Sequence, residues 1–300
     1  MNKFTILSVA SISIIAALYN PANATTFVSR KFECPVGGEK FEANVVASNV
    51  SYGQRPDGRP YSPMPVYPII ECPENGLLLI DEEFTEEELS VLEAAIATPE
   101  YQAMRSEETP YFRAAWLQKL LGEEPVSQVR SLLNATWETD RDPQRKARYQ
   151  TLFIDAAMAM PRTEETADEW LWYNLRAVNA LRELGNFAKA KSHLERVMQP
   201  ENLPSNEEQA GYAIDYADRL RPLLEEANSY FEPANMVPPR MAIFRCVAPK
   251  SPLTSSEIEA CADDDITTAI SEYEFDQEGA ETLHGRAAAE AAAPYYSINY

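Results

Sequence analysis

Two short segments of the chain begin with the residues of a metal-binding knuckle. The first is Cys34-Pro-Val-Gly-Gly, and the second, 38 residues further on, is Cys72-Pro-Glu-Asn-Gly. In a zinc ribbon each knuckle has the pattern Cys-x-x-Cys-Gly, so that two knuckles place four thiolates on one metal ion. Here Gly37 and Asn75 stand where the second cysteine of each knuckle belongs. Two thiols with no histidine nearby do not complete a tetrahedral site, so we expect no metal and no other cofactor.

A loop between the two knuckles, residues 52–61, places charged and aromatic side chains close together. It contains Arg55, Asp57, Arg59 and Tyr61. Its Pro-Asp-Gly sequence is typical of a tight turn, because proline fixes φ and glycine accepts a positive φ. An arginine fork binds a carboxylate or another small anion through two hydrogen bonds, so this loop is the first candidate binding site. The alternative is that both arginines pair with the protein's own surplus carboxylates.

Residues arranged for catalysis are sparse. The two histidines, His193 and His284, lie in no Gly-x-Ser-x-Gly, His-Glu-x-x-His or cysteine–histidine pattern. Residues 263–265 are three aspartates, but a calcium loop needs alternating ligands, a central glycine and a final glutamate, so we interpret them as a solvated helix end. Paired carboxylates can serve a hydrolase, yet such pairs are unavoidable among 47 acidic residues. We assign no catalytic residue.

The net charge restricts the partners of the protein. Its 300 residues include 26 Lys and Arg against 47 Asp and Glu, which gives a formal charge of −21. Nucleic acids and anionic lipid surfaces are excluded as partners, because their phosphates would be repelled. A chain of this length that is 45% hydrophobic can bury a core of one or two domains.

The first 24 residues are typical of a signal peptide. Lys3 supplies the positive start, residues 4–18 form an uncharged and mostly apolar run, and Ala22-Asn-Ala24 fits the cleavage pattern. An uncleaved anchor is the alternative, but a spanning helix needs roughly 20 apolar residues and this run is shorter. We expect a periplasmic or secreted chain that keeps no transmembrane anchor after cleavage.

Export places the cysteines in an oxidising compartment. Cys34, Cys72, Cys246 and Cys261 are even in number, so disulfides are the default expectation. Four cysteines allow three pairings, and free buried cysteines are the alternative. A redox-active pair is disfavoured because no Cys-x-x-Cys is present.

The knuckle region resembles an uncharacterised bacterial family, in which a Cys-Pro-x-Cys-Gly ribbon with two knuckles precedes a helical, tetratricopeptide-like region. The resemblance lies in Cys34-Pro-Val-Gly-Gly-Glu-Lys-Phe, in Pro65-Val-Tyr-Pro-Ile-Ile-Glu-Cys72-Pro, and in the acidic helix start after Leu77. It covers roughly residues 28–120. It implies metal ligands at positions 34, 37, 72 and 75, of which only two are cysteine here, so the zinc does not carry over.

The resemblance also bears on the disulfide pairing. In a ribbon the two knuckles face each other, which holds the first cysteine of each within disulfide reach. We therefore predict that nearest neighbours in the sequence pair, Cys34 with Cys72 and Cys246 with Cys261.

Capping signals and apolar spacing predict a helical body. A Ser or Thr followed three residues later by Glu, the capping box of a helix start, occurs at Thr85, Thr166, Ser205 and Thr254. Helices are predicted over residues 85–97, 100–121, 125–138, 143–159, 166–184, 187–199, 205–229 and 255–272. The four tryptophans all lie on these helices and are assigned to the core: Trp116, Trp137, Trp170 and Trp172.

One predicted hairpin resembles a tetratricopeptide repeat. Gly185-Asn-Phe-Ala-Lys-Ala190 matches the Gly-Asp-Tyr-x-x-Ala of that repeat. The preceding helix departs from the pattern, with Asn174 and Val178 where Trp and a small residue belong, and no second copy lies 34 residues away. We expect irregular stacked hairpins, which leave a groove that can hold a peptide. A purely scaffolding role is the alternative.

The C-terminal part is predicted to be a small appendage. Residues 241–247 have the composition of a short strand, and a Cys246–Cys261 disulfide would tie this strand to the helix that begins near Ser255. Residues 287–293 are a predicted short helix, followed by a loose tail.

These observations predict four parts: a signal peptide (1–24), a degenerate ribbon-like module (25–84), a helical repeat-like domain (85–232) and an appendage with a tail (233–300). The expected fold class is mainly α, a small β module followed by stacked helical hairpins. The leading functional hypothesis is an exported, non-catalytic interaction or scaffold protein of the cell envelope that binds a protein or peptide. The alternatives are a carboxylate-dependent periplasmic hydrolase and a metal-binding protein.

Overall fold

Helices account for most of the structure, and the fold class is mainly α with a small N-terminal β module, as predicted. The computed structural model describes residues 25–276 and 282–299, so the expected signal peptide lies outside the described residues. The helices are α1 Glu86–Ile96, α2 Pro99–Glu107, α3 Pro110–Leu121, α4 Pro125–Glu138, α5 Pro143–Ala159, α6 Ala167–Glu183, α7 Phe187–Val197, α8 Glu207–Glu225, α9 Pro239–Val247, α10 Ser255–Cys261, α11 Asp264–Ser271 and α12 Gly285–Asn299.

Two of the predicted helices are each divided in two. Pro110 begins α3 within the predicted helix 100–121, because its ring fits the first turn but not the middle of a helix. The predicted helix 255–272 is divided at Asp263, whose carboxylate accepts a hydrogen bond from the N–H of Asp265 and caps α11. The run of three aspartates therefore lies at a helix start, where the helix dipole favours negative charge.

The capping predictions are correct at two of the four positions. The boxes at Thr85 and Thr254 form. Thr166 makes no capping hydrogen bond. Helix α8 is capped by Asn206 rather than Ser205, because the side-chain oxygen of Asn206 accepts the N–H of Gln209 at 3.0 Å and satisfies one of the helix's free N–H groups.

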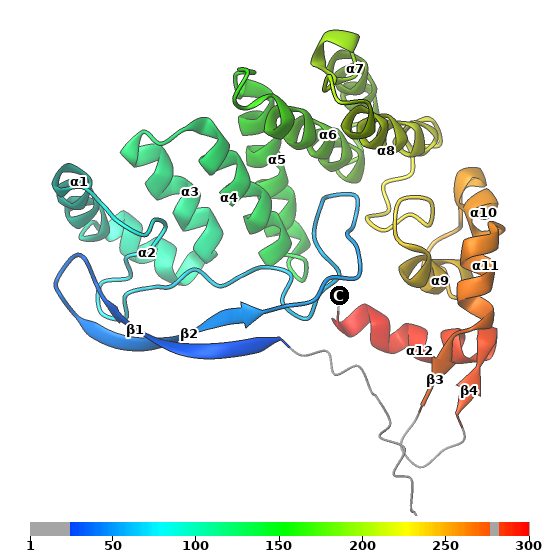
Figure 1. Cartoon of the computed structure of the whole chain (residues 1–300), viewed down its shortest axis with the longest axis horizontal. Coiled ribbons are helices and arrows are strands. Elements are labelled where there is room, and N and C mark those ends of the chain that lie inside the picture. The colour runs from blue at the N-terminus through cyan, green and yellow to red at the C-terminus, as the bar shows by residue number, and fades with distance from the viewer. Residues whose placement is uncertain (1–24, 277–281, 300) are drawn as a thin grey trace, which may run out of the picture.

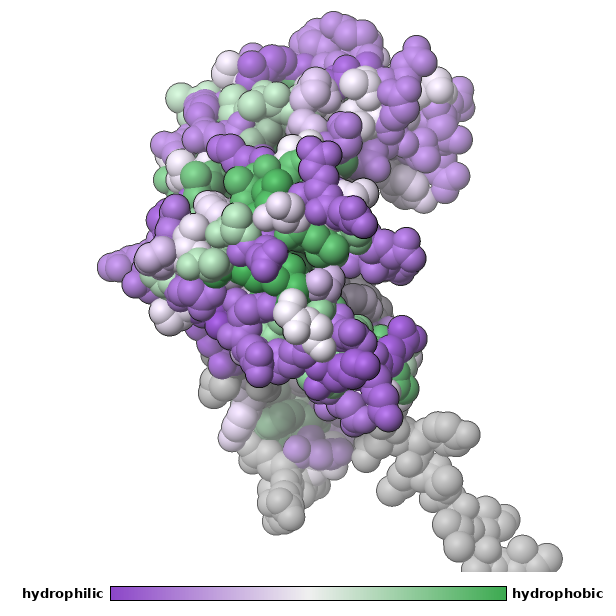
Figure 2. Space-filling model, turned by 90° about the vertical axis from the view of Figure 1, so that its left-hand side faces the viewer, coloured by the Kyte–Doolittle hydropathy of each residue, from purple (hydrophilic) through white to green (hydrophobic). Residues whose placement is uncertain are grey.

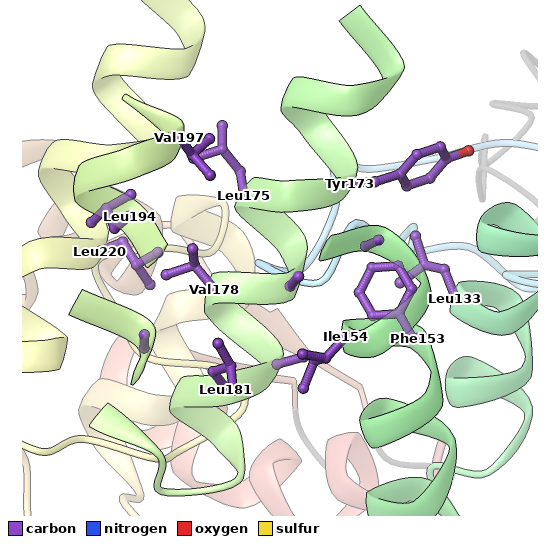
Figure 3. Close-up of a cluster of buried hydrophobic side chains, with 14 of the residues drawn as sticks. Leu133, Phe153, Ile154, Tyr173, Leu175, Val178, Leu181, Leu194, Val197 and Leu220 are labelled. Carbon is purple, nitrogen blue, oxygen red and sulfur yellow. The ribbon is translucent and has the colours of Figure 1, made fainter. Parts of the chain in front are cut away.

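Helices α3 to α8 lie side by side in a curved array (Figure 1). Helix α6 is in the middle of its larger hydrophobic core. Leu175, Val178 and Leu181 of α6 point toward α7 and α8, whereas Tyr173 lies on the other side of the helix, toward Phe153 of α5 (Figure 3). Each helix buries a face against its neighbour, which is the stacked arrangement that the apolar spacing predicts.

A β-ribbon extends along one side of the array (Figure 1). Its strands, β1 Thr26–Glu33 and β2 Lys40–Ser48, are antiparallel. Phe32 is paired with Phe41, and their rings stack with 5.6 Å between the centroids. The ribbon ends at the first knuckle.

The two knuckles form turns with the same backbone hydrogen bonds. In each, the glycine four residues after the cysteine donates to the cysteine carbonyl, at 3.1 Å for Gly38 to Cys34 and 2.9 Å for Gly76 to Cys72. Each cysteine N–H in turn donates to the carbonyl five residues on, at 2.8 Å in both turns. Both glycines have a positive φ, +69° and +78°, a conformation that side chains disfavour.

The two turns face each other and are joined by the predicted Cys34–Cys72 disulfide. Between them the Asn75 amide donates to the Val36 carbonyl at 2.8 Å. A Cβ atom at Gly37 would lie 3.8 Å from the Asn75 amide nitrogen. The four positions of a ribbon's metal ligands therefore converge here, but they hold a cross-link and an amide hydrogen bond.

The C-terminal part differs from the prediction. Residues 241–247, predicted as a strand, belong to helix α9, which has Pro239 at its first position. A seven-residue apolar run fits the period of a strand as well as that of a helix. In the structure the buried residues Ala242, Ile243 and Arg245 share one face of the helix. Helix α12 extends well beyond the predicted 287–293 into the supposed tail.

The second predicted disulfide, Cys246–Cys261, is also present and joins α9 to α10. Two short strands, β3 Glu274–Phe275 and β4 Leu283–His284, pair beside α12. They complete the C-terminal part, which lies at the α8 end of the array (Figure 1).

The face at the α1 end of the molecule carries a group of apolar residues surrounded by polar ones (Figure 2). On helices of this end, Val91 of α1 is 36% exposed and Leu120 of α3 is 44% exposed. The first helices therefore have no further layer over them here. Within the described residues, no helix has both the length and the hydrophobicity that crossing a membrane requires.

Removal of the two disulfides is expected to destabilise the protein to different extents. The Cys34–Cys72 loop spans 38 residues and the Cys246–Cys261 loop 15, so chain entropy gives about 4 and about 3 kcal/mol, respectively. Urea unfolding of the two Cys→Ala double variants measures both values. An unchanged free energy of unfolding in either double variant would contradict this account.

Candidate functional site

The predicted binding loop, residues 52–61, lies between the helical array and the C-terminal part (Figure 1), and its residues 55–59 are buried. The exposed fractions are 2% for Arg55, 6% for Asp57, 7% for Arg59 and 0% for Tyr61. The loop closes as a tight turn, in which the N–H of Arg55 donates to the carbonyl of Arg59 at 2.8 Å. All four candidate side chains therefore lie inside the molecule.

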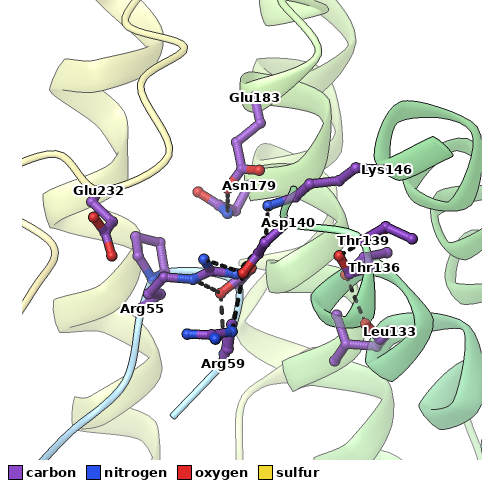
Figure 4. A network of polar contacts seen from close by, with 12 residues as sticks. Arg55, Arg59, Leu133, Thr136, Thr139, Asp140, Lys146, Asn179, Glu183 and Glu232 are labelled. Carbon is purple, nitrogen blue, oxygen red and sulfur yellow. Dashed lines mark hydrogen bonds and ion pairs between the residues drawn. The ribbon is translucent and has the colours of Figure 1, made fainter. Parts of the chain in front are cut away.

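Both arginines of the loop pair with carboxylates of the chain itself (Figure 4). Arg55 makes two hydrogen bonds to Asp57, of 3.1 and 2.6 Å, and two to Asp140 in the turn between α4 and α5, of 2.8 and 3.1 Å. Asp140 also accepts a hydrogen bond from Lys146 at 2.7 Å and lies 3.0 Å from Nε of Arg59. The carboxylates of Asp57 and Asp140 thus pair with three positively charged side chains, those of Arg55, Arg59 and Lys146.

The pKa values of Asp57 and Arg55 both favour the charged form. Burial acts to raise the pKa of Asp57, but attraction to Arg55 outweighs it and lowers this pKa to about 2. Burial likewise opposes the charge of Arg55, yet Asp57 and Asp140 raise the pKa of its guanidinium above its ordinary value. Four of the five N–H donors of Arg55 are used within the chain. The guanidinium of Arg55 is therefore already occupied by the carboxylates of Asp57 and Asp140.

The same network continues into the C-terminal part. The hydroxyl of Tyr61 donates to Glu232 at 2.8 Å, and the hydroxyl of Tyr296 on α12 donates to the same oxygen at 3.3 Å. Burial raises the pKa of the Glu232 carboxyl. On α6 the fully buried Arg182 donates to the carbonyl of Asn228 at 2.8 Å. The loop, the array and the C-terminal part meet at this network.

Helices α2 and α3 hold the turn of the second knuckle, residues 72–77, which precedes α1. The hydroxyl of Tyr101 donates to the carbonyl of Gly76 at 2.7 Å. Arg105 donates to the carbonyls of Pro73 and Glu74, at 3.1 and 3.2 Å. The acceptors are main-chain carbonyls of the turn and also the carboxylate of Glu71, to which Arg105 and Arg113 donate at 3.1 and 2.6 Å.

Neither histidine is arranged for catalysis. His193 is buried, with Nε2 2.9 Å from Oδ1 of Asn174 and Nδ1 2.6 Å from Nη2 of Arg196. Burial, reinforced by Arg196 and Lys189, lowers the pKa of His193 to about 4, so the ring is neutral and both of its nitrogens are engaged. His284 is exposed on β4 and pairs with Glu274.

The residues at the knuckles do not suit a metal ion. Among the described residues no group of three or more His, Cys, Asp or Glu side chains could hold one. Both knuckle cysteines are in the disulfide, so no thiolate is available as a ligand.

Grooves of ligand size lie around the network. One, of about 360 Å³, borders Lys146 and Phe231. A second, of about 450 Å³ between α9, α11 and α12, is lined by rings such as Phe244 and Tyr273. A third, of about 340 Å³, lies between residues 60–67 and helices α3 and α4. Pockets for small ligands span about 300–1,000 Å³. Sequence reasoning missed these grooves because their walls come from distant segments.

Comparisons with known proteins identify no relative of this chain. No protein family matches it, and neither the curated proteins nor the solved structures include a significant match. The function is therefore argued from the chain's own residues.

Replacement of Asp140 by Asn is expected to destabilise the protein by about 3–5 kcal/mol, because it removes the charge that compensates buried cations. Asp215→Asn is the control, since Asp215 forms an exposed pair with Arg219 and should cost less than about 1 kcal/mol. Chemical unfolding measures both. Equal effects of the two substitutions would refute the structural role of Asp140.

The neutral state of His193 predicts a pH dependence of stability. Its pKa is about 4 when folded and about 6.5 when unfolded, so the unfolded state binds more protons between these values. Stability due to this group is therefore present above pH 6.5 and is lost as the pH falls, by roughly 1–2 kcal/mol at pH 5.

His193→Gln should remove this component, whereas His284→Gln, at an exposed position, should not. The measurement is the free energy of unfolding at pH 7 and pH 5. If wild type and His193→Gln lost the same stability between the two pH values, the assignment would be wrong.

Proposed function

We propose that this chain is an exported, non-catalytic interaction protein of the cell envelope that binds a protein or peptide through its helical array. The observation that carries the proposal is that α2 and α3 hold another segment of the chain, the turn of the second knuckle. Tyr101 and Arg105 hold that segment by its main-chain carbonyls. A surface with this chemistry is suited to peptide carbonyls and to an acidic side chain beside them.

Export is supported by two independent features. The first 24 residues have the charge, apolar run and cleavage pattern of a signal peptide. All four cysteines are in disulfides, which persist in oxidising compartments and are rare in the cytosol.

A non-catalytic role is supported by the way the perturbed ionisable groups are used. Asp57 accepts hydrogen bonds from Arg55, and the two ring nitrogens of His193 are engaged by Asn174 and Arg196. Glu232 borders a cavity of only about 50 Å³, well below the usual size of a ligand site. A hydrolase needs a free carboxylate that a substrate can reach. Asp140 and Glu183 line the groove beside Lys146, but Asp140 is engaged by Arg55 and Lys146, and Glu183 by Gln150 and Asn179.

Site-specific photo-crosslinking in the native envelope tests this proposal. A photoreactive amino acid replaces Leu152 on α5 or Tyr212 on α8, which are exposed positions of the array, and Ile258 on α10 serves as the control outside it. We expect the array positions to capture the same envelope protein, and the control position not to. The proposal fails if no array position captures a protein and the purified mature chain binds no peptide.

A further inference from the structure

The ribbon of β1 and β2 is a sheet of only two strands within the described residues (Figure 1). None of its residues is buried, and every residue of β1 except Phe32 is exposed. In β2, by contrast, Phe41, Ala43 and Val45 are half-buried. A two-stranded sheet on its own is marginally stable in water, and an uncovered strand of this length is a template for a further strand. The open strand is β1.

The hydrogen bonds of the first knuckle fix which way the main chain of β1 points. The N–H of Cys34 donates to the carbonyl of Glu39 at 2.8 Å, and the same register continues along the ribbon, with Phe32 opposite Phe41. In an antiparallel pair, residues that bond to the neighbouring strand alternate with residues whose N–H and C=O point away from it. Because Cys34 bonds to the β2 side, the residues two and four positions before it do so too.

The residues between them therefore present their main-chain groups to the free edge of β1. These residues are Ser29, Lys31 and Glu33, and their N–H and C=O groups make no hydrogen bond to any other part of the described chain. Such a row of donors and acceptors, repeating every second residue, matches the main chain of an extended strand. A helix does not match it, because a helix uses its own main-chain groups internally.

The side chains of β1 on one face set an apolar–positive–apolar order. Val28, Arg30 and Phe32 share this face because side chains alternate along a strand. Arg30 is exposed and makes no ion pair or hydrogen bond with its side chain within the described residues. The two lysines of the ribbon differ from it, since Lys31 lies 3.9 Å from Glu42 and Lys40 lies 3.2 Å from Glu33. The unpaired charge of the ribbon is therefore that of Arg30.

This charge disfavours a second copy of the chain as the added strand. The register of β1 is regular over residues 27–33, of which Arg30 is the centre. An antiparallel copy that paired over this whole stretch would place the Arg30 residues of the two copies directly opposite each other. Like charges at such positions are destabilising, whereas an acidic side chain there is stabilising.

We propose that the free edge of β1 binds an extended strand of a partner protein, antiparallel to β1, with an acidic residue opposite Arg30 and an apolar residue two positions to each side of it. The main chain of this strand pairs with Ser29 and Lys31, and its apolar side chains pack beside Val28 and Phe32. The strand carries no further acidic residue, because the net charge of −21 repels a strongly acidic segment. The ribbon is not part of the helical array, so this inference is separate from the proposed function.

Titration of the oxidised mature protein with the capped peptide Thr-Val-Thr-Glu-Thr-Val-Thr tests the inference. We expect saturable binding that slows the exchange of the N–H groups of Ser29, Lys31 and Glu33, which point to the free edge. The same peptide with Lys in place of Glu should bind about fivefold more weakly, the effect of one exposed ion pair. In Arg30→Gln this preference for Glu should disappear.

Two N-methylated forms of the peptide test the main-chain pairing itself. Methylation of the two Thr residues next to Glu removes the N–H groups that face β1 in the proposed register, and should abolish binding. Methylation of the two Val residues alters N–H groups that point away from β1, and should leave binding in place. Equal binding of the two methylated peptides would overturn the inference.

A pair of proline variants distinguishes the two edges of the ribbon. Ser29→Pro removes a main-chain donor from the free edge of β1 and should weaken the affinity about tenfold, the usual effect of one hydrogen bond. Asn44→Pro is the matched control, because Asn44 lies opposite Ser29 and points its main chain to the other edge, that of β2. Proline is tolerated at strand edges where the replaced N–H faces solvent, and Arg30→Gln keeps the test valid if either proline variant is destabilised.

Loss of binding in Asn44→Pro but not in Ser29→Pro would contradict the proposal, as would self-association of the protein that Ser29→Pro abolishes. Crosslinking from the array positions in Ser29→Pro reports on the proposed function separately, since the ribbon takes no part in it.

Discussion

The carboxylate of Asp140 is the interaction on which the arrangement of the molecule depends. It lies in the turn between α4 and α5 and accepts hydrogen bonds from Arg55 and Lys146, with Arg59 beside it. A buried guanidinium without a partner costs several kcal/mol, so the 52–61 loop can enter the interior only where this carboxylate meets it. Once the loop is there, Tyr61 reaches Glu232 and links the array to the C-terminal part.

This internal pairing also shapes the surface of the protein. The buried basic residues include five arginines, namely Arg55, Arg59, Arg113, Arg182 and Arg245. Three acidic residues, Asp57, Glu232 and Glu257, are buried with them, so most of the buried positive charge is balanced inside the molecule. Faces of the array are likewise covered by the chain's own segments, the one before α1 and the 52–61 loop. A partner must therefore use what remains open, such as the groove between residues 60–67 and helices α3 and α4, whose lining residues are uncharged.

Local signals in the sequence were sufficient for most helices, and the resemblance to a zinc ribbon supported the Cys34–Cys72 pairing. The bounds of α4 to α7 follow from apolar spacing, prolines and turns that act within a few residues. Features that depend on distant contacts were not predictable. Asp140 is 85 residues from Arg55, and nothing near either residue signals the other. The prediction of a strand at 241–247 was wrong for a related reason. A short apolar run is compatible with both a strand and a helix, and its contacts with the rest of the chain decide which one forms.

Hydrogen exchange of the loop amides tests most directly whether Arg55 and its neighbours form an internal junction rather than an open binding site. The N–H groups of Arg55, Gly58 and Tyr61 donate within the loop, at 2.8 to 2.9 Å. The account predicts that they exchange as slowly as the amides in the middle of α6, because opening the loop requires breaking the Asp140 pairs. Exchange at the rate of an exposed loop would contradict it.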